Sequence, residues 1–421
     1  MVELQAHPAY RFRWRLALIL FLLGFFVRLA PVVIQRRYED IEKPEIFQIG
    51  EQLAKTGQFA NPFFYPTGPT AMCAPGYPFL LALIFRIMGF GVAAQVVITC
   101  LACACASAQF ALLPWLAAEL RFSSRAGILA GIAGAVFPFW FWIETKGSYE
   151  TTEATLLFVL ALAVTAHYSN GDRHWPAWYG LLWGVVLLVN PAFVTVLAAL
   201  CLLRFIQKRS ASIREIALTA ALAILVLIPW TVRNYVQFRH LFFIRDNFGL
   251  ELSLSNSPRS HALFDDNGGP SGPYALDPNF NAAERARLVK MGEFNYFAAK
   301  KQEAFSWARA HRMRFLELCA QRVFFFWFPR LNATWKTALL AIVTLLGGAG
   351  FLLTARRDPL AAAILGSALL VYPLPYYLVQ VDVRYRYPLY SLLLLCAMVF
   401  ADRFLASRRD SLSPRSASAA E

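Results

Sequence analysis

The chain has 421 residues, of which 58% are hydrophobic and only 16% are charged. Because soluble domains carry about 25% charged residues, this composition excludes an ordinary soluble protein and indicates that most of the chain lies in lipid. The net charge of +14 does not indicate a nucleic-acid partner, since the basic residues fall mostly in short loops between apolar runs. That distribution is the positive-inside pattern of a multi-pass membrane protein.

Residue types that commonly hold metals form no recognisable pattern in the sequence. The seven cysteines and six histidines are scattered without a zinc-type spacing, and the sequence contains no Walker loop. We therefore predict no cofactor, and the sequence leaves the question of a divalent metal open.

Apolar runs recur along the whole chain and predict an all-α polytopic membrane protein with about ten transmembrane helices. The expected spans are 16–35, 92–115, 126–143, 152–167, 178–189, 193–205, 216–230, 337–354, 360–378 and 388–405. The fifth and sixth form a hairpin that is interrupted at Asn190-Pro191, since proline cannot continue a helix.

Basic residues set the expected orientation. Arginines precede the first span, and the basic loops at 208–214 and 356–357 fall on the same face. The positive-inside rule then places both termini in the cytoplasm of a plasma (inner) membrane protein. We expect a cytoplasmic N-terminus at 1–15, followed by a transmembrane domain at 16–232 that contains the first external loop at 36–90. A small external segment at 233–321 then lies between spans seven and eight. The chain ends in C-terminal transmembrane helices at 322–405 and a disordered cytoplasmic tail at 406–421.

The first external loop is acidic in a chain that is otherwise basic. Pro44 can open a helix and Gly57 can close one, while Ile46 and Ile49 recur between them at helical spacing. A second apolar stretch, 78–89, is too short to cross about 30 Å of hydrocarbon, so we expect juxtamembrane helices in this loop. Five carboxylates fall within thirteen residues: Glu39, Asp40, Glu42, Glu45 and Glu51.

Other charged residues lie where spans approach the outer face. Because charge near the bilayer is costly, it tends to be functional or paired. Lys146 and Glu150 lie between spans three and four, and Arg28 lies inside the first span, where it either reaches a lipid phosphate, snorkels, or pairs with an acid of the next loop. Arg384 and Arg386 precede the last span, where they either bind an anionic headgroup through paired hydrogen bonds or belong to an interfacial belt.

Taken in order, these stretches resemble the polyprenyl-phosphate-dependent glycosyltransferases of the GT-C superfamily, relatives of the protein O-mannosyltransferases and the aminoarabinose transferases. The matching stretches are KTGQFANPF and PGYPFLLALIFRIMG in the first loop, YETTEATLL at the fourth span, PWTVRNY after the seventh, and RYRYP before the last. The resemblance covers nearly the whole chain and implies a GT-C-like bundle.

The resemblance also implies roles for particular residues. Glu45 is the nearest match to the catalytic base of the first loop, and Asp40 competes with it because Glu39-Asp40 is an acidic pair at the head of the loop. Glu150 matches a second acid that faces this loop. The implied donor-binding residues are Arg384, Arg386, Lys146, Arg28 and Arg233.

The function implied is transfer of a sugar from a polyprenyl-phosphate donor to a lipid, glycan or protein acceptor on the outer, extracytoplasmic face, with a loop carboxylate as general base. The alternative is a polytopic transporter or a flippase for lipid-linked sugars. Such proteins often show internal repeats and helices broken near the midplane, and this sequence shows neither clearly. A purely structural membrane scaffold would not need the acid and arginine clusters.

Overall fold

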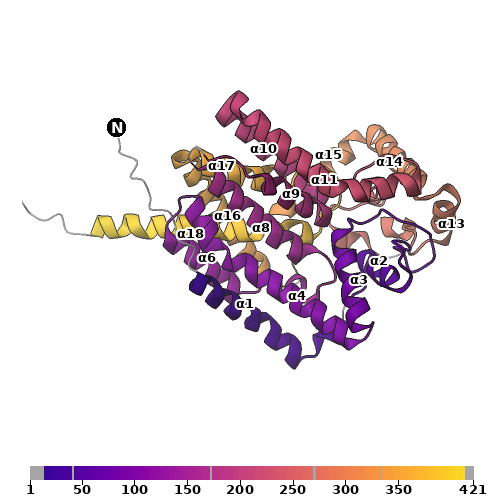
Figure 1. Ribbon diagram of the computed structural model, residues 1–421, viewed down its shortest axis with the longest axis horizontal. Helices are drawn as coiled ribbons and strands as arrows, with labels where there is room; N and C mark the ends of the chain where they lie inside the picture. Colours follow the sequence, from indigo (N-terminus) through magenta and orange to yellow (C-terminus); the bar gives the residue numbers. More distant parts are fainter. Residues whose placement is uncertain (1–13, 40–41, 171–172, 269–271, 332, 413–421) are drawn as a thin grey trace, which may run out of the picture.

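The computed structural model describes residues 14–39, 42–170, 173–268, 272–331 and 333–412, and helices dominate it (Figure 1). These residues form no β-strand, only two isolated bridges. The prediction of an all-α protein is therefore confirmed.

The helices fall into a set that forms the bundle and a second set that lies mainly in the segments predicted to be external. The first set contains α1 (Trp14–Ile34), α4 (Val92–Ala111), α5 (Leu113–Glu119), α6 (Ser124–Val136), α8 (Thr151–Ser169), α9 (Ala177–Val189), α10 (Val194–Lys208), α11 (Ile213–Phe238), α16 (Thr334–Arg357), α17 (Pro359–Gly366) and α18 (Val383–Leu412). The second contains α2 (Glu45–Thr56), α3 (Gly76–Met88), α7 (Phe141–Lys146), α12 (Phe248–Ser255), α13 (Ala282–Met291), α14 (Glu293–Ala310) and α15 (Arg312–Trp327).

Within the described residues, seven segments are long and apolar enough to cross a membrane. They are Trp14–Ile34, Val92–Glu119, Thr151–Ser169, Pro191–Phe238, Thr334–Arg357, Pro359–Tyr377 and Val383–Ala406. The fourth of these contains both α10 and α11, and α6 and α9 are shorter apolar helices. Each of the ten predicted runs thus coincides with helix, while the number of membrane crossings stays a prediction.

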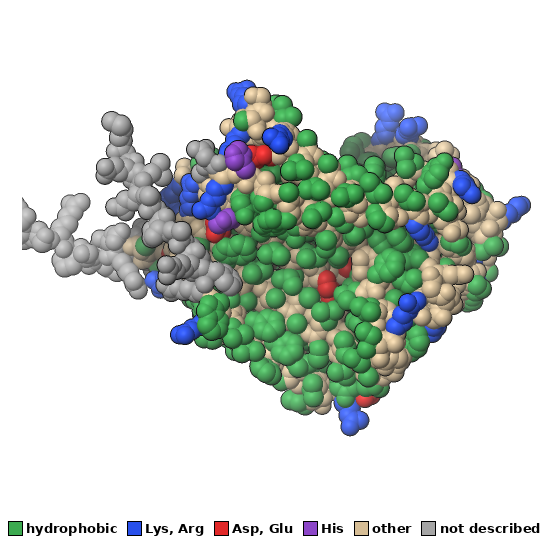
Figure 2. Space-filling view, in the orientation of Figure 1, with side chains coloured by type: hydrophobic (Ala, Val, Ile, Leu, Met, Phe, Trp, Pro, Cys, Tyr) green, Lys and Arg blue, Asp and Glu red, His purple; other side chains and the backbone are tan. Residues whose placement is uncertain are grey.

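The surface agrees with a lipid environment. Figure 2 shows hydrophobic side chains over most of the visible face, with Lys and Arg mainly toward its edges. Large apolar side chains such as Phe26, Leu225 and Leu352 are exposed on the long helices, an arrangement that water would penalise and lipid favours. The chain is an integral membrane protein.

Three helix boundaries differ from the sequence prediction. The third run is broken, because Pro138 lies between α6 and α7 and interrupts helical hydrogen bonding. The seventh continues to Phe238, so Arg233 lies within α11 rather than beyond its end. The external segment passes directly into α15, which continues to Trp327.

The polar helices gather at one end of the bundle. Figure 1 shows α2, α3, α13 and α14 together at this end, while the start of α1, the end of α18 and the turn between α10 and α11 lie toward the opposite end. The sequence-based orientation assigns the first end to the outer face and the second to the cytoplasm. The two segments predicted to be external therefore lie at the same end of the molecule.

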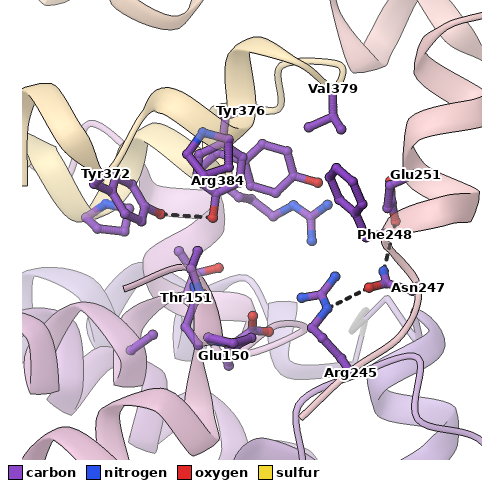
Figure 3. A pocket seen from close by; sticks show the side chains of 17 residues that line it. Glu150, Thr151, Arg245, Asn247, Phe248, Glu251, Tyr372, Tyr376, Val379 and Arg384 are labelled. Atoms are coloured by element: carbon purple, nitrogen blue, oxygen red, sulfur yellow. Dashed lines mark hydrogen bonds between the residues drawn. The ribbon is translucent and has the colours of Figure 1, made fainter. Parts of the chain in front are cut away.

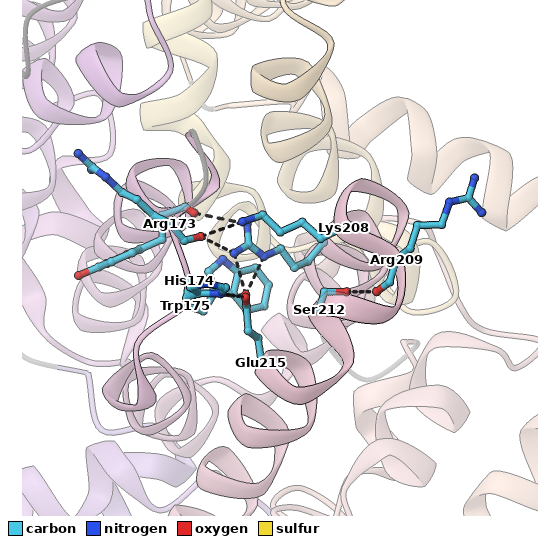
Figure 4. Close-up of polar contacts among 9 residues, drawn as sticks. Arg173, His174, Trp175, Lys208, Arg209, Ser212 and Glu215 are labelled. Carbon is cyan, nitrogen blue, oxygen red and sulfur yellow. Dashed lines mark hydrogen bonds and ion pairs between the residues drawn. The ribbon is translucent and has the colours of Figure 1, made fainter.

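A buried arginine orders the opposite end (Figure 4). Arg204 is almost fully buried and donates to Glu215 Oε2 at 2.7 Å and to the Arg173 carbonyl at 2.6 Å. Its guanidinium also lies over the Trp175 ring, and His174 contacts the same glutamate. These contacts fix the α8–α9 connection against the α10–α11 hairpin.

A short main-chain pairing connects the external segment to the approach of the last helix. The Phe264 amide donates to the Val381 carbonyl, and the Val381 amide donates to the Ala262 carbonyl, each at 2.9 Å. Asn267 adds a 2.6 Å hydrogen bond from Nδ2 to Gln380 Oε1. The residues that lead into α18 are thus held by a segment more than a hundred positions earlier in the chain.

Candidate active site

Two adjoining cavities of about 250 and 140 Å³ lie at the polar end of the bundle. They share six lining residues, so we treat them as two chambers of one cavity. The shared residues are Glu150, Arg245, Asn247, Glu251, Arg384 and Tyr385.

The smaller chamber, called the polar chamber here, is lined by carboxylates from four separate elements. Glu45 is the first residue of α2, Glu150 caps α8, Glu251 lies on α12, and Asp277 follows a 3₁₀ turn. Acids brought together from such distant positions cannot be explained by one local surface pattern.

Glu45 reaches this chamber because its helix folds as the sequence predicts. Pro44 precedes the first turn of α2, and Gly57 ends the helix in a left-handed conformation with φ 74°. Ile46, Ile49 and neighbouring apolar residues are buried, which leaves Glu45 half-buried at the chamber wall.

The larger chamber, called the aromatic chamber here, takes part of its wall from the segment between α17 and α18. Its wall includes Tyr372, Tyr376 and Phe248, and Ala192 contributes from the turn that follows the Asn190-Pro191 break. The hydroxyl of Tyr372 donates to that of Tyr376 at 3.3 Å. This chamber therefore offers apolar and aromatic surface beside the carboxylates.

Two arginines lie where the chambers meet (Figure 3). Arg384 donates to Asp382 Oδ2 from Nε and Nη2, both at 2.8 Å, and its guanidinium carbon lies 3.5 Å from the centre of the Tyr149 ring. Arg245 donates from Nε to Asn247 Oδ1 at 2.6 Å. Figure 3 shows both guanidinium groups pointing into the space between them.

Burial shifts three acids of the polar chamber, Glu150, Glu251 and Asp277, toward their neutral forms. It raises the pKa of Glu150 and of Glu251 above the ordinary value for glutamate, and nearby Arg245 and Arg384 partly oppose both shifts. Burial also raises the pKa of Asp277 to about 7. Carboxylates that titrate closer to neutrality are better proton acceptors and donors at physiological pH.

Three of the predicted residues line the cavity, a fourth lies close by, and a fifth lies outside the described residues. Glu45, Glu150 and Arg384 line it together. Lys146 lies close by, lining a small recess with Arg384, and its Nζ contacts Glu42 Oε1 at 3.2 Å. Asp40 lies outside the described residues.

The structure does not bring the other three predicted arginines to the cavity wall. Arg28 is fully buried, donates to the carbonyls of Gly24, Gly134 and Ala135, and lies 3.1 Å from Glu144. Of the three alternatives for Arg28, the structure shows pairing with an acid. The acid is Glu144 of α7 and not a residue of the first loop.

Arg233 and Arg386 are likewise occupied elsewhere. Arg233 donates to the carbonyls of Thr70 and Phe59 at 2.8 and 2.9 Å, which anchors the first loop to α11. Arg386 is buried and donates to Thr344 on α16. Because α18 begins at Val383, residues two positions apart lie about 200° apart around the helix, so Arg384 and Arg386 point to different sides.

Sequence reasoning missed three charged residues of the cavity, Arg245, Glu251 and Asp277. Arg245 follows the aromatic run after α11, and Glu251 is the single charge of the helix FGLELSLS. For Glu251, the available signal was a single acid inside an otherwise apolar stretch. Arg245 gave none, because an arginine after a helix exit is common in membrane proteins.

Comparisons with known proteins identify the fold. No family model matches the chain, and no curated protein matches its sequence. A crystal structure of the Archaeoglobus fulgidus oligosaccharyltransferase, tethered to an acceptor peptide containing the NVT sequon, aligns with a TM-score of 0.57 at 13% identity, over 95% of this chain and 51% of that one.

A second structure gives a similar alignment. The archaeal oligosaccharyltransferase AglB from Archaeoglobus fulgidus, in complex with an inhibitory peptide and a dolichol-phosphate, aligns with a TM-score of 0.52 at 13% identity, over 96% of this chain and 53% of that one. The chain spans about half the length of these enzymes. The predicted fold, a polytopic helical bundle that the chain shares with these structures, is therefore confirmed.

Proposed function

We propose that this protein is a membrane glycosyltransferase that moves a sugar from a polyprenyl-phosphate donor to an acceptor on the outer face. One observation carries the proposal: Arg245 and Arg384 lie between a chamber lined by carboxylates and a chamber lined by aromatic side chains. A polyprenyl-phosphate sugar has the same order of parts, with a phosphate between a polar sugar and an apolar chain.

Arg384 is well suited to the donor phosphate. Asp382 takes up its Nε hydrogen and one Nη2 hydrogen, so three of the five guanidinium hydrogens remain for a ligand. Arg245 approaches from the opposite side with its Nη groups directed into the cavity. Planar guanidinium groups bind phosphate oxygens through paired hydrogen bonds, and two of them would stabilise the charge of a departing phosphate.

Glu45 is the proposed general base, with Glu150 as the second acid of the polar chamber. In the reaction, the carboxylate takes the proton from an acceptor hydroxyl or amine while the acceptor atom attacks the anomeric carbon. The bond from that carbon to the phosphate oxygen breaks, and the electron pair leaves with the polyprenyl phosphate. Asp40 is the competing base.

The same reasoning gives the classes of donor and acceptor. We propose a polyprenyl-phosphate-linked sugar as donor and a lipid, glycan or protein as acceptor. The proposed reaction routes no step through a metal, but one structure of the archaeal enzyme is a complex with Zn and sulfate. The assay is therefore run both with added divalent cations and with EDTA.

The test measures sugar transfer by the purified full-length chain in lipid nanodiscs, using synthetic polyprenyl-phosphate sugars. Glu45→Gln keeps shape and hydrogen bonding but cannot accept a proton, so turnover should fall by about 10² to 10⁴. Glu42→Gln is the matched control, because Glu42 is exposed on the same loop and contacts Lys146.

The outcomes separate the competing assignments. Normal transfer by Glu45→Gln beside an inactive Asp40→Asn would move the base to Asp40. Normal transfer by both would remove the first loop from the chemistry. If no donor sugar is transferred while a fluorescent lipid-linked sugar crosses sealed vesicles that contain the protein, the flippase alternative replaces this proposal.

A further inference from the structure

A third cavity, of about 200 Å³, lies in the external segment between α12, the chain that follows it, and α14. Leu254 lines both this cavity and the polar chamber, so the two cavities are neighbours, and it is the one lining residue that they have in common. None of the residues assigned above to acid–base chemistry or phosphate binding lines it. We call it the α14 cavity.

Two hydrogen-bond donors of the α14 cavity are not fully used. The indole Nε1 of Trp307 is buried and has no hydrogen-bond partner among the described residues. Lys300 is nearly fully buried, and its Nζ contacts Glu284 at 2.9 Å and Glu303 at 3.2 Å. An ammonium group carries three hydrogens, so one remains. Buried donors are normally satisfied, and an oxygen-bearing ligand would satisfy both.

The charges around the cavity cancel, which limits the ligand to a neutral molecule. Lys300 is balanced by Glu284 and Glu303, and Arg287 pairs with Glu303 at 2.8 Å. Among the described residues that line the cavity, the charged side chains are Lys300 and Glu303, and because they pair with each other no net positive charge remains there to attract a phosphate or a carboxylate. A ligand that offers hydroxyl oxygens without charge fits this balance.

The remaining walls suit the face of a ring. His311 stacks on Trp307 with ring centres 5.2 Å apart and planes at 20°, which fixes the indole plane. Pro258, Pro273 and Leu276 add apolar surface. Ligand sites commonly combine such apolar walls with a few placed polar groups, and a sugar ring presents apolar C–H faces and hydroxyl edges.

We propose that the α14 cavity binds one neutral sugar residue of a glycan, at a site separate from the catalytic cavity. The Trp307 indole and the free Lys300 hydrogen donate to its hydroxyl oxygens, and the proline-lined wall packs on its ring. Because binding here involves no donor phosphate and no catalytic carboxylate, it does not require the proposed transferase reaction.

Saturation-transfer difference NMR tests this on the full-length protein in nanodiscs, free of alkyl-maltoside detergents whose headgroups would compete. The probes are the methyl glycosides of glucose, galactose, mannose and N-acetylglucosamine, with glucuronate as the charged comparison. At least one neutral glycoside should bind, and Trp307→Phe should weaken it about three- to tenfold, the effect of losing one hydrogen bond.

Two further variants make the result specific. Leu276→Trp fills the cavity from an exposed position and should abolish binding even if Trp307→Phe folds poorly. Trp335→Phe, at an exposed tryptophan on α16, should leave binding unchanged. Binding that survives both Trp307→Phe and Leu276→Trp would overturn the proposal, as would the absence of binding by every neutral glycoside or binding of glucuronate alone.

Discussion

The guanidinium carbon of Arg384 lies 3.5 Å from the centre of the Tyr149 ring, and Tyr149 directly precedes Glu150. This contact joins the first turn of α18 to the start of α8. It places the proposed phosphate-binding residue beside the second carboxylate of the site. With Asp382 at its edge and Tyr149 on its face, the guanidinium of Arg384 has its plane fixed before any donor arrives.

Replacing Arg384 by lysine should weaken binding of the donor about tenfold or more. Lysine keeps the charge, but it loses the planar fork and two of its fixed hydrogen bonds. Isothermal titration with a non-transferable polyprenyl phosphate measures the change. Arg386→Lys is the control: its side chain contacts Thr344 away from the cavity, so donor affinity should stay near normal. Equal losses in the two variants would contradict the separation of these arginines around α18.

The buried pair Arg28–Glu144 should stabilise the bundle rather than bind substrate. Arg28→Met should lower the free energy of unfolding by about 3–5 kcal/mol, because it leaves Glu144 as an uncompensated buried charge. The double variant Arg28→Met/Glu144→Gln should be more stable than Arg28→Met alone. Thermal unfolding in detergent measures both. If Arg28→Met keeps its stability but binds the donor more weakly, Arg28 would be a phosphate ligand instead.

Stability should depend on pH through Asp246 and Glu293. Glu293 accepts from the Ala71 amide at 2.6 Å. Burial raises the pKa of Asp246 to about 7, and burial together with the charge of Asp246 raises the pKa of Glu293 well above its ordinary value. Arg233 and Arg245 partly oppose the shift of Asp246. Between about pH 4, the unfolded value for aspartate, and pH 7, the folded protein binds more protons than the unfolded chain. The free energy of unfolding therefore falls as pH rises.

Asp246→Asn removes one of these titrations. The melting temperature of this variant should fall less between pH 5 and pH 8 than that of the wild type. Glu317→Gln, at an exposed residue of α15, should follow the wild-type curve. A wild-type melting temperature that rises over this interval would show that the pair is not protonated in the folded state.

The orientation in the membrane can be tested with single cysteines in a background lacking the seven native ones. Arg259→Cys lies in the external segment and Ser210→Cys lies in the turn between α10 and α11, and both positions are exposed. In intact cells an impermeant maleimide should label the first and not the second. The reverse pattern would invert the predicted topology and place the cavity on the cytoplasmic face.

Helix positions were largely predictable because they depend on local sequence. Long apolar runs, Pro44 before α2, Gly57 after it and the Asn190-Pro191 break all act within a few residues. The continuation of α11 from Trp230 to Phe238 was not predictable in this way. Its polar last turns are stabilised by tertiary contacts, such as those of Arg233 with the first loop.

The site was only partly predictable because its residues meet through tertiary packing. Glu45 and Glu150 could be found from local position and family resemblance. Arg384 and Arg386 look equivalent in the sequence, and only the start of α18 at Val383 separates them. Arg245 depends on the path of a loop without regular structure, so no periodicity in the sequence indicates where it points.

The main-chain pairing of Ala262 and Phe264 with Val381 limits how this protein can be recombined. Val381 lies three residues before Arg384, so this pairing holds the external segment in a fixed position relative to the arginine of the cavity. A chimera that exchanges residues 239–327 with those of another protein of this fold would also have to exchange the approach to α18. The external segment is therefore not an interchangeable module.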